Sequence, residues 1–75
     1  MNIEAVRTIS QTWIENGEQH VAIVLAGTRG TVYGVVQEDG WKLAVRWTVV
    51  HASHNQTANT DMDVNPDDVR TIYFA

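Results

Sequence analysis

The amino-acid sequence predicts a small, mainly all-β domain, in which five strands form a barrel or a strongly bent antiparallel sheet with one short helical turn near residues 66–69. Three observations support this prediction. The length of 75 residues suits a single domain, 1–75. The pairs Asn16-Gly17 and Asp39-Gly40 are two-residue turn signals of the type that needs positive φ. The segments around these turns are rich in β-branched and aromatic residues, which favour strands.

The N-terminal segment has two interpretations. A helical spacing is shared by Ile3, Val6, Ser10 and Trp13. Residues 6–14, however, are dense in β-branched side chains, which are poor helix formers, and they lead directly into Asn16-Gly17. We therefore expect a strand that pairs with residues 19–26 across this turn, and a helix over residues 3–14 is the alternative.

The clearest local prediction is a β-hairpin formed by residues 31–38 and 41–50 across Asp39-Gly40. Alternate positions of its second strand are apolar and fall on one face: Trp41, Leu43, Val45, Trp47 and Val49. The positions between them are mostly polar. We expect Val45 to be fully buried, because it lies in the middle of the apolar face.

Residues 21–26 are apolar on both faces of their expected strand, and a small barrel covers only one face of each strand. Residues 3–14 are one candidate for the second cover, and a second copy of the chain is the other. The three tryptophans, Trp13, Trp41 and Trp47, fit either one core or an interface, where tryptophan is enriched. Together these features predict self-association as a symmetric homodimer, the commonest closed arrangement of identical chains.

Residues 51–62 are the only long polar stretch and predict a loop that is either functional or mobile. After it, Asn65 is suited to cap one helical turn that begins at Pro66. Residues 71–74 predict a short closing strand.

Composition narrows the class of protein. Five basic residues against nine acidic ones give a formal net charge of −4, which disfavours nucleic acid as a partner. The chain has no cysteine, so it forms neither a disulfide nor a cysteine-based zinc site. The longest apolar stretch, residues 21–26, is too short to span a membrane, and the first residues lack the pattern of a signal peptide. We therefore expect a cytoplasmic protein that does not act at a membrane.

Residues suited to catalysis or metal binding are sparse. Ser10 and Ser53 lack an arrangement with a base and an orienting acid, so we expect no catalytic residues. His51 and His54 form an H-x-x-H pair that, with Asp61 or Asp63, has ligands suited to a divalent metal. On a non-helical loop this spacing does not place both imidazoles on one face. We therefore expect neither a metal site nor a cofactor.

Residues 19–74 resemble the small SH3-like barrels, including the KOW-type and Tudor-type domains. The resemblance rests on a glycine-turn strand entry, a hairpin through Asp39-Gly40, a strand that ends near Trp47, and a short turn before a last strand. The entry is Gly27-Thr28-Arg29-Gly30-Thr31-Val32 and the turn is Pro66-Asp67-Asp68-Val69. The resemblance implies a module that binds protein, peptide or nucleic acid, and only rarely an enzyme.

Small size, the absence of cysteine and a surplus of apolar residues favour a non-catalytic interaction protein, which binds or inhibits another protein as an oligomeric β-module of the kind that phages and mobile elements encode. Two alternatives stay open: an oligomeric small-ligand or nucleotide-binding protein or enzyme with a shared site, and a nucleic-acid-binding SH3-like module. Arginine beside aromatic rings suits stacking and phosphate contact. The candidate residues for binding a ligand or partner are Trp41, Tyr33, Arg29, Arg46, His51 and His54.

Overall fold

The computed structural model describes residues 1–53 and 60–72, and these residues form an all-β fold with a 3₁₀ turn at Pro66–Asp68, as predicted. Over this part of the chain there are seven strands and the turn η2: β1 (Asn2–Ala5), β2 (Ile9–Glu15), β3 (Glu18–Val24), β4 (Arg29–Gln37), β5 (Trp41–Trp47), β6 (His51–Ala52), η2 (Pro66–Asp68) and β7 (Val69–Thr71). None of the described segments is a helix of the length and apolarity that crossing a bilayer requires.

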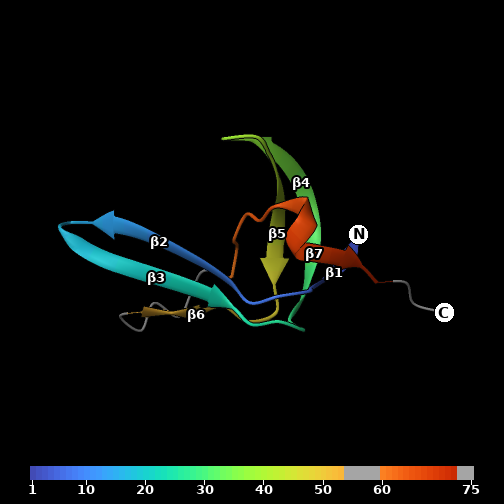
Figure 1. Cartoon of the computed structure of the whole chain (residues 1–75), viewed down its shortest axis with the longest axis horizontal. Coiled ribbons are helices and arrows are strands. Elements are labelled where there is room, and N and C mark those ends of the chain that lie inside the picture. Colours follow the sequence, from blue (N-terminus) through green and yellow to red (C-terminus); the bar gives the residue numbers. More distant parts are fainter. Residues whose placement is uncertain (54–59, 73–75) are drawn as a thin grey trace.

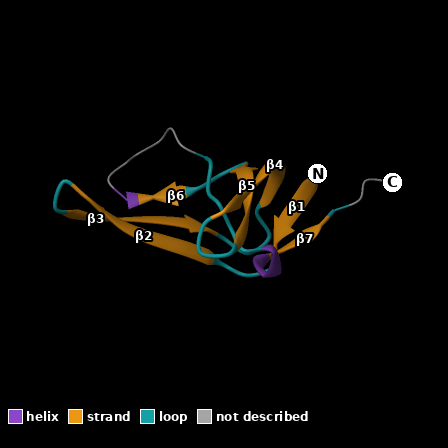
Figure 2. Ribbon diagram, turned by 90° about the horizontal axis from the view of Figure 1, so that it is seen from above, coloured by secondary structure: helices purple, strands orange, loops and turns teal. Residues whose placement is uncertain are grey.

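The strands form two antiparallel sheets. One sheet has the order β5-β4-β1-β7 and the other the order β2-β3-β6. Figure 1 shows the β2–β3 hairpin extending to the left of the larger sheet, in which β4 and β5 run nearly vertically. Seen from above, the two sheets occupy opposite ends of the molecule, which measures 45 × 25 × 19 Å (Figure 2).

Short connections carry the chain from one sheet to the other. Three residues separate β1 from β2, four separate β3 from β4, and three separate β5 from β6. The sequence patterns predicted only five strands. They do not show where the chain leaves one sheet and begins a short strand in the other. The short strands β1 and β6 are therefore additional to the prediction.

The N-terminal segment forms two strands, β1 and β2, and the helical alternative is wrong. β2 pairs with β3 along its whole length, from Ile9 opposite Val24 to Glu15 opposite Glu18. The turn between them has φ values of 53° at Asn16 and 78° at Gly17. These positive values suit the primed turns whose twist matches that of two paired strands.

The second hairpin is also confirmed, with φ values of 51° at Asp39 and 96° at Gly40 between β4 and β5. Val45 is 0 % exposed, as expected from its place on the apolar face. Trp47 on the same face is also buried and donates its indole Nε1–H to the carbonyl of Met62 at 3.1 Å. A buried tryptophan usually needs such a partner for its N–H.

One core joins the two sheets. It consists of the buried side chains of Ile3, Ala5, Ile9, Ala22, Val24, Val45, Trp47, Met62 and Val64. Within the single chain, only one face of residues 21–24 is fully covered. Ala22 and Val24 enter the core, while Val21 and Ile23 are half-buried on the opposite face. Residues 9–15 lie beside this strand in the same sheet and therefore do not cover that face.

Residues 60–62, the end of the stretch that was expected to be a loop, are paired with β5, as are the two residues that follow. Met62 donates its backbone N–H to the carbonyl of Val45 at 3.0 Å, and Leu43 and Val64 exchange two backbone hydrogen bonds of 2.8 and 3.0 Å. Residues 60–64 thus lie along β5 as a further antiparallel segment. Because Met62 and Val64 are buried while Asp61 and Asp63 are not, this segment has the period-two alternation of a strand.

Two details near the end of the chain differ from expectation. Asn65 precedes η2 in an extended conformation, but its side chain makes no capping hydrogen bond, and its carbonyl instead accepts the N–H of Asp68 at 3.0 Å. The last strand is Val69–Thr71, earlier than predicted. The rest of the expected closing strand at 73–74 and the expected loop at 54–59 lie outside the described residues.

Candidate functional site

The structure brings two of the predicted binding residues together, Tyr33 and Arg46. The guanidinium carbon of Arg46 lies 5.7 Å from the centre of the Tyr33 ring, within the range of a cation–π contact. Arg46 also donates from Nε to Oδ1 of Asp61 at 3.1 Å. These three residues connect β4, β5 and the segment 60–64 on the outer face of the larger sheet.

The charges around Tyr33 act mainly against its ionisation. Loss of water around the phenol raises the pKa of Tyr33, and the charges of Asp61 and Asp63 raise it further, while Arg46 opposes them. The hydrogen bond with Asp61, followed by the charge of Asp61, raises the pKa of Arg46. The carboxylate of Asp61 therefore neutralises the positive charge of Arg46, which an anionic ligand would need for binding.

The other predicted binding residues are spread over the molecule. Arg29 begins β4 and contributes its carbonyl, which accepts from the backbone N and from Oγ1 of Thr48. His51 is exposed on β6, in the other sheet. Trp41 and Arg46 are separated by an odd number of positions along β5, so their side chains project from opposite faces of the larger sheet. His54 lies outside the described residues.

An exposed apolar patch extends from the core along the β4–β5 hairpin. Val35 lies opposite Leu43, and Trp41 lies diagonally next to Val35 on the same face. Leu43 is half-buried, whereas Val35 is 58 % and Trp41 62 % exposed. We call Val35, Leu43 and Trp41 the hairpin patch. It continues the face that buries Val45, beyond the point where the core ends.

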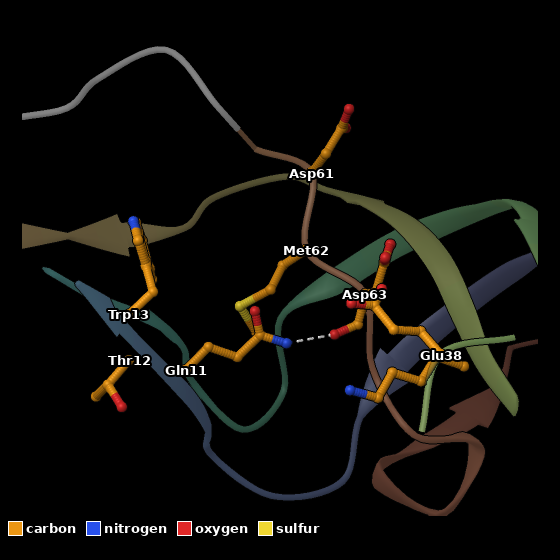
Figure 3. A pocket seen from close by; sticks show the side chains of 8 residues that line it. Gln11, Thr12, Trp13, Glu38, Asp61, Met62 and Asp63 are labelled. Atoms are coloured by element: carbon orange, nitrogen blue, oxygen red, sulfur yellow. Dashed lines mark hydrogen bonds between the residues drawn. The ribbon is translucent and has the colours of Figure 1, made fainter. Parts of the chain in front are cut away.

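A cleft of about 580 Å³ separates β2 from the segment 60–64. Figure 3 shows Gln11, Thr12 and Trp13 on one wall and Asp61, Met62 and Asp63 on the other. The walls are bridged by the side-chain amide of Gln11, whose Nε2 donates to the backbone carbonyl of Asp63 at 2.6 Å (Figure 3). Glu38 and Lys42 of the β4–β5 hairpin complete the lining.

Two smaller hollows adjoin the cleft and extend it at both ends. One, of about 260 Å³, is lined by Trp13 and Met62 together with Ala22, Val50 and Ala52. The other, of about 220 Å³, reaches Ile9 and Asn65. The cleft therefore follows the edge of β2 from Ile9 to Trp13. Sequence reasoning missed it, and the alternation at residues 61–64 was the signal that would have located one wall.

The residues considered for catalysis and metal binding are described over 1–53 and 60–72, which leaves out His54. Ser53 accepts the backbone N–H of Val21 at its Oγ, at 3.0 Å, which is a structural role. Within the described ranges, no three His, Asp or Glu side chains come close enough together to hold a metal ion. What the surface does offer is exposed aromatic area and a long cleft.

Comparisons of this chain with protein-family models, with curated proteins and with solved structures give no match. Its function is therefore inferred from the chemistry of its surface.

Proposed function

We propose that this chain is a small non-catalytic module that binds another protein through the hairpin patch. The observation that carries this proposal is the exposure of Trp41 and Val35 side by side on the face that elsewhere forms the core. Contiguous exposed apolar side chains are characteristic of interaction sites, and tryptophan is prominent among the residues that dominate binding energy.

The likeness of residues 19–74 to small SH3-like barrels points in the same direction, since those domains are mostly binding modules. The competing classes fit less well. A site for an anionic ligand at Tyr33 and Arg46 is weakened by the ion pair with Asp61. A nucleic-acid interface is opposed by the net charge of −4.

The test is affinity capture with the tagged chain from extracts of the organism that encodes it, followed by reconstitution of the complex from purified partner. Trp41→Ala removes the largest side chain of the hairpin patch. We expect it to weaken the complex by about tenfold or more, as truncation of an interfacial tryptophan commonly does.

Val6→Ala is the matched control, because Val6 is also an exposed apolar residue but lies in the connection between β1 and β2. Equal affinity of wild type, Trp41→Ala and Val6→Ala would contradict the hairpin patch as the binding surface. A rise in melting temperature with a nucleotide or a divalent metal, in the absence of any protein partner, would favour the ligand-binding alternative.

A further inference from the structure

Two strand edges border the cleft. β2 is the outermost strand of the sheet β2-β3-β6, and the segment 60–64 lies outside β5 at the edge of the larger sheet. In the part of the chain that is described, neither edge has a further strand beside it. A strand edge presents a row of backbone donors and acceptors, and it is a template for pairing with another chain.

The backbone of Asp63 points into the cleft from one wall. Met62 and Val64 direct their hydrogen bonds to β5, so Asp63 between them turns its N–H and C=O the opposite way. The bond from Gln11 to the Asp63 carbonyl agrees with this orientation. Gln11 therefore occupies an acceptor that an added strand would use.

On the other wall, Thr12 is oriented in the same manner. Its cross-strand neighbour Val21 donates its backbone N–H to Ser53, on the side of β3 that is away from β2. Antiparallel pairs alternate between bonded and non-bonded, so the backbone groups of Thr12 point away from β3 and toward the edge. Both edges thus have backbone groups that face away from their own sheets, and an added strand would displace the Gln11 amide from the Asp63 carbonyl.

The side chains around the cleft define the chemistry of an occupant. Three carboxylates line it, those of Glu38, Asp61 and Asp63, against the single amine of Lys42. Asp61 is already paired with Arg46, so Glu38 and Asp63 contribute most of the negative field. The adjoining hollow beside Trp13 and Met62 accepts an apolar side chain.

We propose that the cleft binds one extended segment of a partner protein by strand addition, with a basic side chain against Glu38 and Asp63 and an apolar side chain between Trp13 and Met62. This inference rests on the proposed function in assuming a protein partner, but it uses a separate surface. The cleft volume of about 580 Å³ is of the size that binding sites commonly have, roughly 300–1,000 Å³. Main-chain hydrogen bonds provide affinity in this mode, and the alternate side chains provide specificity.

The probe is a short synthetic peptide of alternating lysine and valine, titrated into the ¹⁵N-labelled full chain and followed by amide NMR. We expect shifts confined to residues 9–13 and 61–65 and to the β4–β5 turn. A glutamate–valine peptide should bind about tenfold more weakly or not at all, because its charges match those of the cleft. The lysine–valine peptide with alternate backbone amides methylated should also lose about tenfold or more, because it has lost its donors.

Glu38→Lys and Asp63→Lys each reverse one charge of the cleft, and both should weaken binding of the lysine–valine peptide and relieve rejection of the glutamate–valine peptide. Glu15→Lys makes the same change of net charge on the β2–β3 hairpin outside the cleft lining, and it should leave both affinities unchanged. The amide spectrum of each free variant shows whether it is folded, and either folded cleft variant suffices for the test.

Several results would overturn the inference: shifts located elsewhere, equal binding of the methylated peptide, or equal binding by Glu38→Lys and Glu15→Lys. Shifts at the cleft that depend on protein concentration alone would identify a second copy of the chain as the occupant and would also overturn it. A captured partner that is lost with Trp41→Ala but retained by both cleft variants would leave the proposed function standing and remove only the cleft from it.

Discussion

Gly30 is a position in β4 where the fold requires the absence of a side chain. A Cβ at this position would lie 2.7 Å from Cγ1 of Val45 and 2.9 Å from the Trp47 ring. Both neighbours belong to the close-packed core, so neither can move away without disturbing others. We expect Gly30→Ala to lower the free energy of unfolding by about 1–3 kcal/mol, measured by urea denaturation.

Gly34→Ala on the same strand is the matched control for this prediction. Its Cβ would meet only the Cβ of Ala44, at the ordinary contact distance of 3.8 Å, and its φ is not positive. The stability of Gly34→Ala should equal or slightly exceed that of the wild type, because alanine restricts the unfolded chain. Similar losses in the two variants would show that β4 rejects any side chain at either glycine.

Val45 gives a second prediction at this scale. Val45→Ala should cost about 1–3 kcal/mol, because it removes two methyl groups from the core and leaves a cavity. Val35→Ala makes the same chemical change at a largely exposed site of the hairpin patch, where we expect a change of at most about 0.5 kcal/mol. Denaturation midpoints that do not differ between the two variants would be inconsistent with the assigned inner face of β4 and β5.

The raised pKa of Tyr33 can be measured by following phenolate absorbance against pH. In a Tyr73→Phe background only Tyr33 contributes, and its midpoint should lie above 10.0. The neutral phenol is the form favoured by folding, so its contribution to stability is present below pH 10 and is lost as the pH rises through the raised pKa. Asp61→Asn should move the midpoint back toward 10.0, and a midpoint at or below that value in the parent protein would contradict the arrangement.

Among the elements, both hairpins were predictable because turn chemistry and period-two patterning agree there. Asn16-Gly17 and Asp39-Gly40 take the positive φ values that the sequence indicates. The segment 60–64 was missed, since its two buried residues, Met62 and Val64, stand among polar neighbours and gain their cover from β5. Local composition does not reveal pairing with a distant strand.

The candidate site was only partly predictable for a related reason. Tyr33 and Arg46 were named for their chemistry, and they do meet. A register shift between Val32 and Gly34 then places Val35 on the face of Leu43 instead of that of Tyr33. Such a bulge changes which residues share a face, and no alternation pattern in the sequence reports it. The cleft depends on Gln11 and Asp63 coming together, which are far apart in the chain.

Hydrogen exchange tests the orientation of the segment 60–64. The amides of Met62 and Val64 donate to β5 and should be protected, whereas the intervening amide of Asp63 points into the cleft and should exchange faster. The amide of Leu43, which donates to Val64, serves as an internal reference within β5. Uniformly fast exchange at Met62, Asp63 and Val64 would show that the segment is a loop, as its composition suggested.

For the whole molecule, we predict self-association as a homodimer. Ile14, Val21 and Ile23 share the outer face of the smaller sheet, and Ile14 is 77 % exposed. Among the described residues, no further sheet packs on this face. Light scattering at micromolar concentration should give twice the chain mass of 8.4 kDa. Ile14→Lys should restore the mass of one chain and Val6→Lys should not. A wild-type mass of 8.4 kDa would refute the dimer.

The position of β1 between β4 and β7 has a consequence for synthesis on the ribosome. Ile3 pairs with Gly30 on one side and with Thr71 on the other, so one neighbour of β1 is synthesised well before the other. Until β7 emerges, one edge of β1 has no partner strand and the nascent sheet is incomplete. Domains dominated by pairings of such long sequence separation fold slowly, typically in milliseconds to seconds. The chain is therefore most exposed to misassociation in the interval between the emergence of β4 and that of β7.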